Sequence, residues 1–266
     1  MQLRKGSESR SGVAPLGRIN AILLPPRGNT DALPVAEGMA RLTGATLRIL
    51  DDEVSEGRTA ASILAEEAKN WESCLIVTSA PSETTALLQG RRPIVLVPPG
   101  ARGRSPWALR RMLVPHDGTP VASTSLGSAG DLCRCAQAEM TMLHVATTAA
   151  DQARDIGAVR VPYYMDQPQH EWPAWGQEFL DRALAIGKPP CDVKLRTVLC
   201  TEDIAQVIVD VAAQDQSDLI VLACRMSLED GRICIIRQVV QKAPCPVLII
   251  PVENRSTVQH VHDREI

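Results

Sequence analysis

Short apolar runs alternate with longer stretches of helical periodicity along the chain. In the C-terminal half, the apolar runs predict strands, and the stretches with apolar residues at every third or fourth position predict amphipathic helices. The predicted strands are 111–115, 139–145, 193–199, 218–223 and 246–251, and the predicted helices are 120–137, 174–187, 201–214 and 232–242. Strands that are apolar on both faces and alternate with helices predict a parallel sheet covered by helices on both sides.

The N-terminal half repeats this pattern. AILLPP (21–26) is followed by a turn, a helical stretch and a second apolar run, as MLVP (112–115) is. The last apolar runs of the two halves also match, since RPIVLVPP (92–99) is similar in sequence to CPVLIIPV (245–252). A tandem duplication of one α/β unit explains these matches, with its boundary in the Gly-, Pro- and Arg-rich linker 99–110.

The first copy is the shorter one. Only residues 51–58 separate its second apolar run from a helix that begins near Thr59, so one helix–strand unit of the second copy is missing here. We therefore expect about four strands in the first copy against five in the second. The predicted fold class is α/β, with two tandem doubly wound parallel-sheet domains at residues 18–99 and 110–252, the N-terminal one truncated.

Two helix starts carry capping signals. Thr119 precedes Pro120, a hydroxyl cap followed by proline in the first turn. Thr201 precedes Glu202 and Asp203, so it is the predicted N-cap of the helix at 201–214, with two carboxylates favourable to the helix dipole.

Composition limits the function classes. The net charge of -3 and the pI near 6.0 argue against a nucleic-acid partner or an anionic membrane surface, which both need a basic face. No run approaches the roughly 18 apolar residues of a membrane span, and the N-terminal MQLRKGSESRSG lacks the apolar core of a signal peptide. The eight cysteines have no disulfide-framework spacing, so we expect a reduced, cytoplasmic protein.

The motifs at the start and end of the second copy resemble those of the universal stress protein family. They are VPHDGT (114–119), then a helix and MTMLHV (140–145), and later DLIVLA (218–223) with APCPVLIIP (243–251). The resemblance implies a doubly wound sheet of the adenine nucleotide alpha hydrolase-like type. It also implies pairing through the last strand, here residues 94–99 antiparallel to 246–252, as an intramolecular pseudo-dimer. Homodimerisation through other surfaces is compatible with this arrangement.

Many members of that family bind ATP, and the resemblance implies which residues would do so here. Asp117 and Val145 match the positions that hold adenine and ribose. The phosphate loop of ATP-binding members, Gly-x2-Gly-x9-Gly-(Ser/Thr), is absent from LACRMSLEDGRICIIRQ (222–238), in which Ala223 stands at the first glycine. Glu229 and Asp230 add negative charge where a polyphosphate would lie, which disfavours its binding.

Asp117 also has a purely structural interpretation, which we favour. In an Asp-Gly turn the carboxylate accepts hydrogen bonds from nearby backbone N–H groups. The neighbouring His116, a single histidine at a strand end, is more often structural than catalytic. No Ser-His-Asp set, paired carboxylates or metal-ligand spacing stands out, and Cys133 and Cys135 face different sides of a helix.

The first hypothesis is thus a cytoplasmic binding or regulatory module with a degenerate ATP site that does not turn over ATP and has no catalytic residue or bound metal. The alternative is an adenine-nucleotide binding protein or slow ATPase that uses the C-terminal domain only, with AMP a better ligand than ATP. Its nucleoside contacts would be Asp117, Gly118, Thr119 and Val145, and its phosphate contacts Arg225, Ser227 and Arg232. A third hypothesis is a thiol or metal sensor.

One segment remains outside these motifs. Residues 161–179 hold five of the seven aromatic residues of the chain, among them Trp172, Trp175 and Phe179. The cluster could stack on a ligand or a partner, or it could cover the apolar surface left by the truncated first half. We favour the covering role.

Overall fold

The structure, a computed structural model, describes residues 16–25, 30–50, 59–79, 92–101, 106–147, 171–200, 203–225 and 232–252. The strands in these residues are β1 (Ala21–Leu24), β2 (Thr46–Ile49), β3 (Cys74–Thr78), β4 (Ile94–Leu96), β5 (Arg111–Pro115), β6 (Glu139–Thr147), β7 (Val193–Cys200), β8 (Leu219–Arg225) and β9 (Val247–Val252). The α-helices are α1 (Leu33–Thr43), α2 (Ala60–Glu67), α4 (Pro120–Ala136), α5 (Glu171–Gly187), α6 (Ile204–Gln214) and α7 (Arg232–Lys242).

The described strands form a single sheet in the order β2-β1-β3-β4-β9-β8-β5-β6-β7. All neighbours in it are parallel except β4 and β9, which pair antiparallel with Val95 opposite Leu248. The predicted antiparallel pairing of 94–99 with 246–252 is therefore confirmed for residues 94–96 with 247–249. Within the described residues, the N-terminal half has four strands and the C-terminal half has five, as expected. The α/β fold with a mostly parallel sheet is confirmed as well.

The strand order is related between the two halves. In the N-terminal half it is β2-β1-β3-β4, and in the C-terminal half the corresponding strands run β6-β5-β8-β9, with β7 added beside β6. Because β2 has no strand in the place of β7, it lies at the edge of the sheet, and the Ile49 side chain is 54% exposed there. Among the described residues, the shorter N-terminal half thus ends at β2, an edge strand of the sheet.

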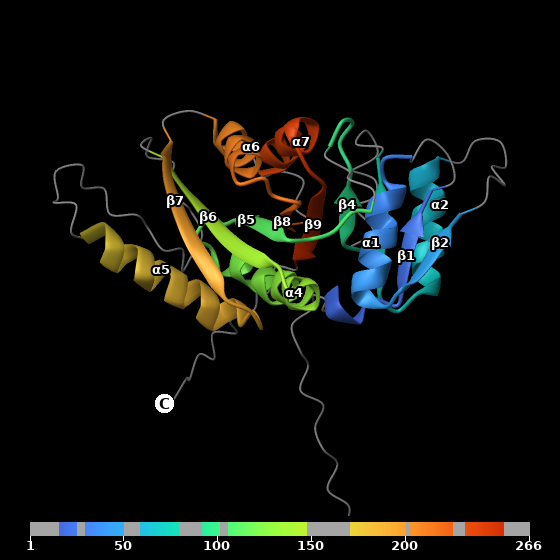
Figure 1. Ribbon diagram of the computed structural model, residues 1–266, viewed down its shortest axis with the longest axis horizontal. Coiled ribbons are helices and arrows are strands. Elements are labelled where there is room, and N and C mark those ends of the chain that lie inside the picture. Colours follow the sequence, from blue (N-terminus) through green and yellow to red (C-terminus); the bar gives the residue numbers. More distant parts are fainter. Residues whose placement is uncertain are drawn as a thin grey trace, which may run out of the picture.

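Two apolar cores lie on opposite faces of this sheet. One contains residues of α1, α4 and α5, and the other contains residues of α2, α6 and α7. Figure 1 shows α6 and α7 above the sheet and α4 and α5 below it, with α5 at the far end from the N-terminal half. Each core runs through both halves, so the halves share their hydrophobic interior.

The end of the predicted linker belongs to this interior. Trp107 and Leu109 are both buried, and the backbone carbonyl of Trp107 accepts a hydrogen bond from Arg41 of α1. A Cβ atom at Gly38 would stand 2.5 Å from the Trp107 ring, so α1 approaches the tryptophan closely only because position 38 is glycine. The linker thus ties α1 to the C-terminal half.

The helix starts test the two capping predictions. Thr119 is the N-cap of α4, and its side chain accepts the Ala122 N–H, as predicted. The prediction for Thr201 is wrong, because α6 begins at Ile204 and the carboxylate of Asp203 accepts the Ala205 N–H. Carboxylate and hydroxyl side chains cap comparably, so the polar run 201–203 alone did not reveal which residue caps the helix.

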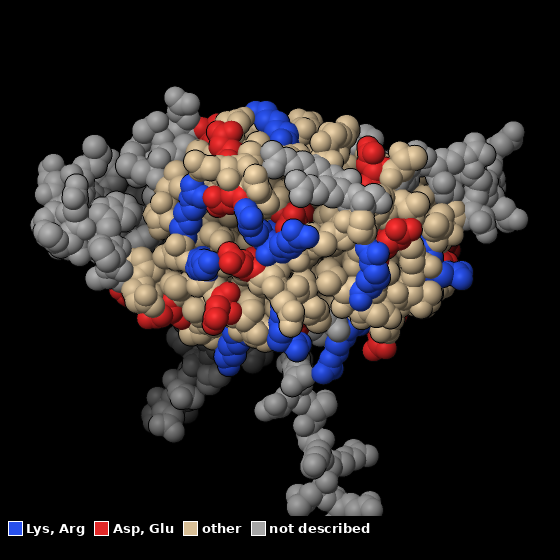
Figure 2. All heavy atoms as spheres, in the orientation of Figure 1, with Lys and Arg blue, Asp and Glu red and all other residues tan. Residues whose placement is uncertain are grey.

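On the face seen in Figure 2, basic and acidic side chains are interspersed. Two ion pairs link the strands and helices of the C-terminal half, Lys194 with Glu139 and Arg196 with Asp215. No helix in the described part of the chain is long and apolar enough to cross a membrane.

Candidate functional site at the end of strand β5

The candidate site is the turn that joins β5 to α4. Strand β5 lies between β6 and β8 in the sheet. β6 is the next strand in the sequence, whereas β8 comes much later. In parallel α/β sheets, ligands bind beyond the carboxyl ends of the strands where the chain order reverses in this way. Residues 116–119 stand at that point.

The turn is held by its own side chains. Gly118 has a φ of 81°, which favours glycine, and its N–H donates to Nδ1 of His116 over 3.0 Å. The Oδ1 atom of Asp117 accepts the N–H of Thr119 at 3.0 Å and its hydroxyl at 2.7 Å. Thr119 is fully buried, whereas Asp117 is exposed. One carboxylate oxygen is thus used to shape the turn and the start of α4.

These contacts determine the tautomer of His116. Because Nδ1 accepts the Gly118 N–H, the ring proton of the neutral imidazole is on Nε2. Nε2 then donates to the hydroxyl of Ser123 at 3.0 Å, and that hydroxyl donates to the carbonyl of Thr119 at 3.2 Å. A histidine that donates to serine cannot take its proton, so this pair is not an activated nucleophile.

A second histidine adjoins the first. His144 of β6 is buried, and its Nδ1 lies 3.0 Å from the backbone carbonyl of His116. A carbonyl only accepts, so His144 carries its proton on Nδ1. The ring of Phe179 from α5 contacts both imidazoles, with centroid distances of 5.5 Å to His116 and 4.6 Å to His144.

Both imidazoles are held in the neutral form. Burial lowers the pKa of His116 to about 4, and the ring of His144 lowers it further against the opposing effect of the Asp117 carboxylate. Burial also lowers the pKa of His144, although its hydrogen bond to His116 and the charge of Asp117 act in the other direction. The neutral state agrees with the tautomers that the hydrogen bonds require.

A shallow cleft opens beside these rings, between the start of α4 and the middle of α5. Its lining comprises His116, Gly118, Pro120, Ser123, Phe179, Arg182, Ala183 and Ile186. The free volume is about 10 Å³, the room of roughly one water molecule. Arg182 is exposed and gives the rim a positive charge.

Comparison with known proteins identifies the family. The family model described as Usp, the universal stress protein family, matches residues 108–251, more than half of the chain. The chain belongs to the universal stress protein family. The resemblance read from VPHDGT and the closing strand is therefore confirmed.

Two solved structures that cover most of this chain share its fold, and a third matches part of it. A universal stress protein from Archaeoglobus fulgidus is 10% identical, with 89% of this chain and 97% of that chain covered and a TM-score of 0.55. A functionally unknown protein from Pseudomonas aeruginosa PAO1 is 14% identical, with coverage of 89% and 94% and a TM-score of 0.60. A universal stress protein from Archaeoglobus fulgidus in complex with dAMP is 17% identical over 54% of this chain and 98% of that one, with a TM-score of 0.36. Curated proteins gave no match.

The structure brings together only part of the predicted site of this universal stress protein. Asp117, Gly118 and Thr119 form the turn, and Val145 follows His144 on the adjacent strand β6 and is half-buried. Arg225 ends β8 and Arg232 begins α7, but their side chains lie outside the described residues, as does Ser227 entirely. The predicted phosphate contacts remain predictions.

Ser123 and His144 were not predicted, and Phe179 was predicted only as one member of an aromatic cluster that could stack on a ligand. Phe179 is the only phenylalanine of the chain, and it shares one face of α5 with Ala183 and Ile186, at the helical spacing that puts all three on the cleft. That spacing was a usable signal. The contact with the two histidines was not, since they come from distant segments.

The covering role favoured for the aromatic segment is wrong for its described part. Phe179 is buried against His116 and His144, and α5 packs on α4 and β7, at the end of the molecule opposite to the N-terminal half (Figure 1). Apolar residues of α5 are buried within the C-terminal half itself. Residues 161–170 and the side chains of Trp172 and Trp175 lie outside the described residues.

The cysteines were also tested. Cys133 is buried and Cys135 exposed, so they face different sides of α4, as predicted. Within the described segments, no three His, Cys, Asp or Glu side chains are grouped so that they could hold a metal ion.

Proposed function

We propose that this universal stress protein is a binding or regulatory module whose ATP site is degenerate, and that it does not turn over ATP. The observation that carries the proposal is the use of Asp117. Its Oδ1 atom holds the N–H and hydroxyl of Thr119, so the carboxylate serves the turn before it serves any ligand.

The space beside the turn supports the same conclusion. Among the described residues, Phe179 and Ala183 of α5 line the cleft beside His116, and its free volume of about 10 Å³ is the room of about one water molecule. A nucleoside placed between α4 and α5 would have to displace the Phe179 ring from the two imidazoles. Binding there therefore costs the contacts that hold α5, which weakens any affinity.

The sequence between β8 and α7 argues against a phosphate-binding loop. A phosphate loop needs glycines that let backbone N–H groups approach the anion at the start of a helix. Between β8 and α7 the only glycine is Gly231, and Glu229 and Asp230 stand beside it. Each carboxylate repels a polyphosphate, so ATP is disfavoured more strongly than a nucleoside.

We also propose that the chain is a tandem pair, with domains at 18–99 and 110–252. The related strand order of the two halves and the antiparallel contact of β4 with β9 support this interpretation. The contact satisfies two sheet edges that would otherwise invite aggregation.

A second candidate function is nucleotide binding by the C-terminal domain alone. The exposed carboxylate of Asp117 at the chain reversal between β5 and β8 favours it, because ligands gather at such points. Asp117, Gly118, Thr119 and Val145 would then contact the nucleoside of AMP, and Arg225, Ser227 and Arg232 its phosphate.

Isothermal titration with ATP, ADP, AMP and cyclic AMP separates the two functions. The first predicts no micromolar binding of ATP. Micromolar ATP binding that is lost in Asp117→Ala would overturn it. The second predicts binding of AMP in preference to ATP, and titrations without heat for all four nucleotides would overturn the second. Asp203→Ala, a carboxylate removed at another helix start, is the matched control and should leave any binding unchanged.

A further inference from the structure

The C-terminal part of α4 lies unusually close to the connection between α5 and β7. A Cβ atom at Gly127 would stand 2.7 Å from the carbonyl oxygen of Gly187, and one at Gly130 would stand 2.7 Å from side-chain atoms of Pro189 and Pro190. Such distances exclude any side chain at positions 127 and 130 without rearrangement. The two segments therefore run along each other, with position 127 next to 187 and position 130 next to 189–190.

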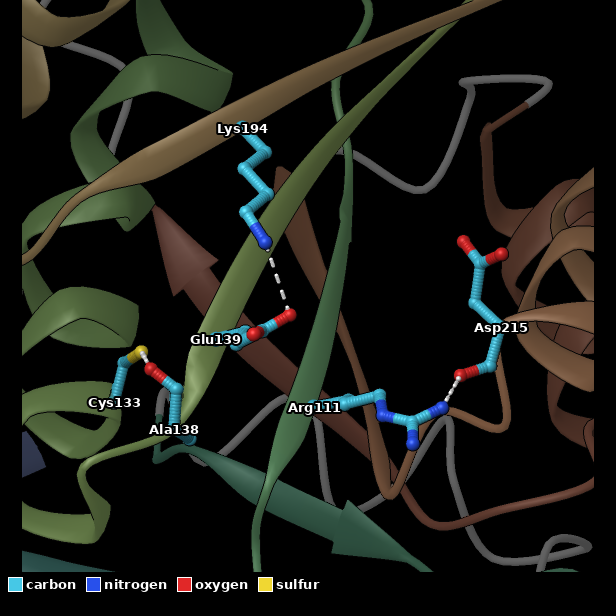
Figure 3. Close-up of polar contacts among 6 residues, drawn as sticks. All are labelled: Arg111, Cys133, Ala138, Glu139, Lys194 and Asp215. Carbon is cyan, nitrogen blue, oxygen red and sulfur yellow. Dashed lines mark hydrogen bonds and ion pairs between the residues drawn. The ribbon is translucent and has the colours of Figure 1, made fainter.

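Two cysteines continue this alignment. Cys133 lies one helical turn beyond Gly130 on the same face of α4, and Cys191 follows Pro190. The two thiols lie close enough for each to shift the pKa of the other. The Cys133 thiol donates to the backbone carbonyl of Ala138 over 2.8 Å (Figure 3), which fixes its orientation at the C-terminal end of α4.

We propose that Cys133 and Cys191 form a disulfide when the protein meets a small-molecule disulfide oxidant, and that this bond fastens α5 to α4. Cys191 is half-buried and Cys133 fully buried, so Cys191 is the point of entry. Its thiolate attacks the oxidant, forms a mixed disulfide and releases one small thiol. The Cys133 thiolate then attacks the sulfur of Cys191 and releases the second small thiol. The two cysteines lose two electrons and two protons, which the two released thiols carry away.

The bond would act on the helices that build the candidate site. Ser123, at the other end of α4, holds His116, and α5 carries Phe179. With Cys133 joined to Cys191, the C-terminal ends of α4 and α5 can no longer separate, which restricts movement of α5 against α4 beside the cleft. The inference stands whether or not a nucleotide binds there.

The pKa values of the two thiols predict how fast the disulfide forms. Burial raises the pKa of Cys133 to about 12, and the neighbouring Cys191 adds to the effect. Burial raises the pKa of Cys191 as well. The interaction with Cys133 acts against this, whereas the carboxylates of Asp192 and Asp131 raise the pKa further. Exchange needs the thiolate, so we expect slow formation at pH 7 and about tenfold faster formation at pH 8.

Digestion with trypsin separates the cysteines into different peptides, so that the disulfide partner of each can be identified. Trypsin cuts after Arg134, which places Cys133 in peptide 112–134 and Cys135 in peptide 135–154, while Cys191 lies in peptide 183–194. The full chain is incubated with oxidised glutathione, the remaining thiols are alkylated, and the non-reduced digest is analysed by mass spectrometry. We expect peptide 112–134 linked to peptide 183–194, and the loss of this species on reduction.

Cys135→Ser is the matched control, two residues away on the exposed side of α4. It should keep the linked species, whereas Cys191→Ser should lose it with a circular dichroism spectrum like that of the natural chain. The oxidised protein should also melt at a higher temperature than the reduced one, since the bond closes a long loop. Glutathione that remains attached to Cys191 without the linked pair, a link through Cys135 instead, or no oxidation at pH 8 would each overturn the proposal.

Discussion

The ring of Phe179 stands edge-on against the imidazole of His116, with 88° between the two planes. This contact joins α5 to the turn that follows β5, and the second imidazole, His144, completes the cluster. The aromatic residue thus holds α5 on the sheet beside the turn of the candidate site. Its packing should dominate the stability of this end of the molecule.

Phe179→Ala should destabilise the fold strongly. The side chain is 1% exposed, and removal of a buried phenylalanine typically costs about 3–5 kcal/mol. Ile186→Ala on the same helix is the control, because that side chain is 40% exposed and its truncation should cost roughly 1 kcal/mol or less. Urea unfolding followed by circular dichroism measures both. Equal losses for the two variants would contradict the packing described for Phe179.

Acid should weaken the fold through His116. Its pKa is lowered to about 4 in the folded state, against about 6.5 in an unfolded chain, so between these values the unfolded state binds more protons. The free energy of unfolding therefore falls as the pH drops from about 6.5 to about 4, by on the order of 3 kcal/mol from this residue.

The comparison that checks this contribution is His116→Gln. Glutamine retains an amide that can donate to Ser123, but it does not titrate. Unfolding of both proteins is measured from pH 7.5 to pH 4, and carboxylates contribute alike to each. We expect a flatter pH dependence in His116→Gln, and curves that run parallel would show that His116 does not stay neutral on folding.

Much of the fold followed from the sequence because the strands are apolar on both faces. Runs such as Met112–Val114 and Val247–Ile250 can be buried only inside a covered sheet, so their order along the chain indicated the topology. The pairing of β4 with β9 came from the family resemblance, since nothing within either strand specifies an antiparallel neighbour.

The site was less accessible to such reasoning. Asp117 and Thr119 lie within one turn, and their contacts follow from local chemistry. Phe179, His116 and His144 meet only after α5 has packed on α4 and β6 has paired with β5. Their contact depends on how α5 is rotated about its axis and on the angle at which it crosses α4. The pattern of apolar positions does not specify either closely enough to place the Phe179 ring.

The cap of α6 offers a paired test of two neighbouring residues. Asp203→Ala removes the carboxylate that accepts the Ala205 N–H, and the loss of such a cap typically costs about 1 kcal/mol. Thr201→Ala should change the free energy of unfolding by less than about 0.5 kcal/mol, because the cap belongs to Asp203. Urea unfolding at neutral pH measures both variants. A larger loss for Thr201→Ala would restore the cap that the sequence had suggested.

Gly118 tests whether the turn depends on its backbone conformation. Its φ of 81° is strained for residues with a Cβ atom, so Gly118→Ala should destabilise the protein by about 1–2 kcal/mol. Gly118→Asn should cost less, because asparagine tolerates the left-handed region. The N–H that donates to His116 is present in all three proteins, so the difference isolates the backbone strain. Thermal and urea unfolding of the three proteins should rank them glycine, asparagine, alanine. Alanine equal to or better than asparagine would mean that the turn relaxes to a different conformation, and that Asp117 is not held as described.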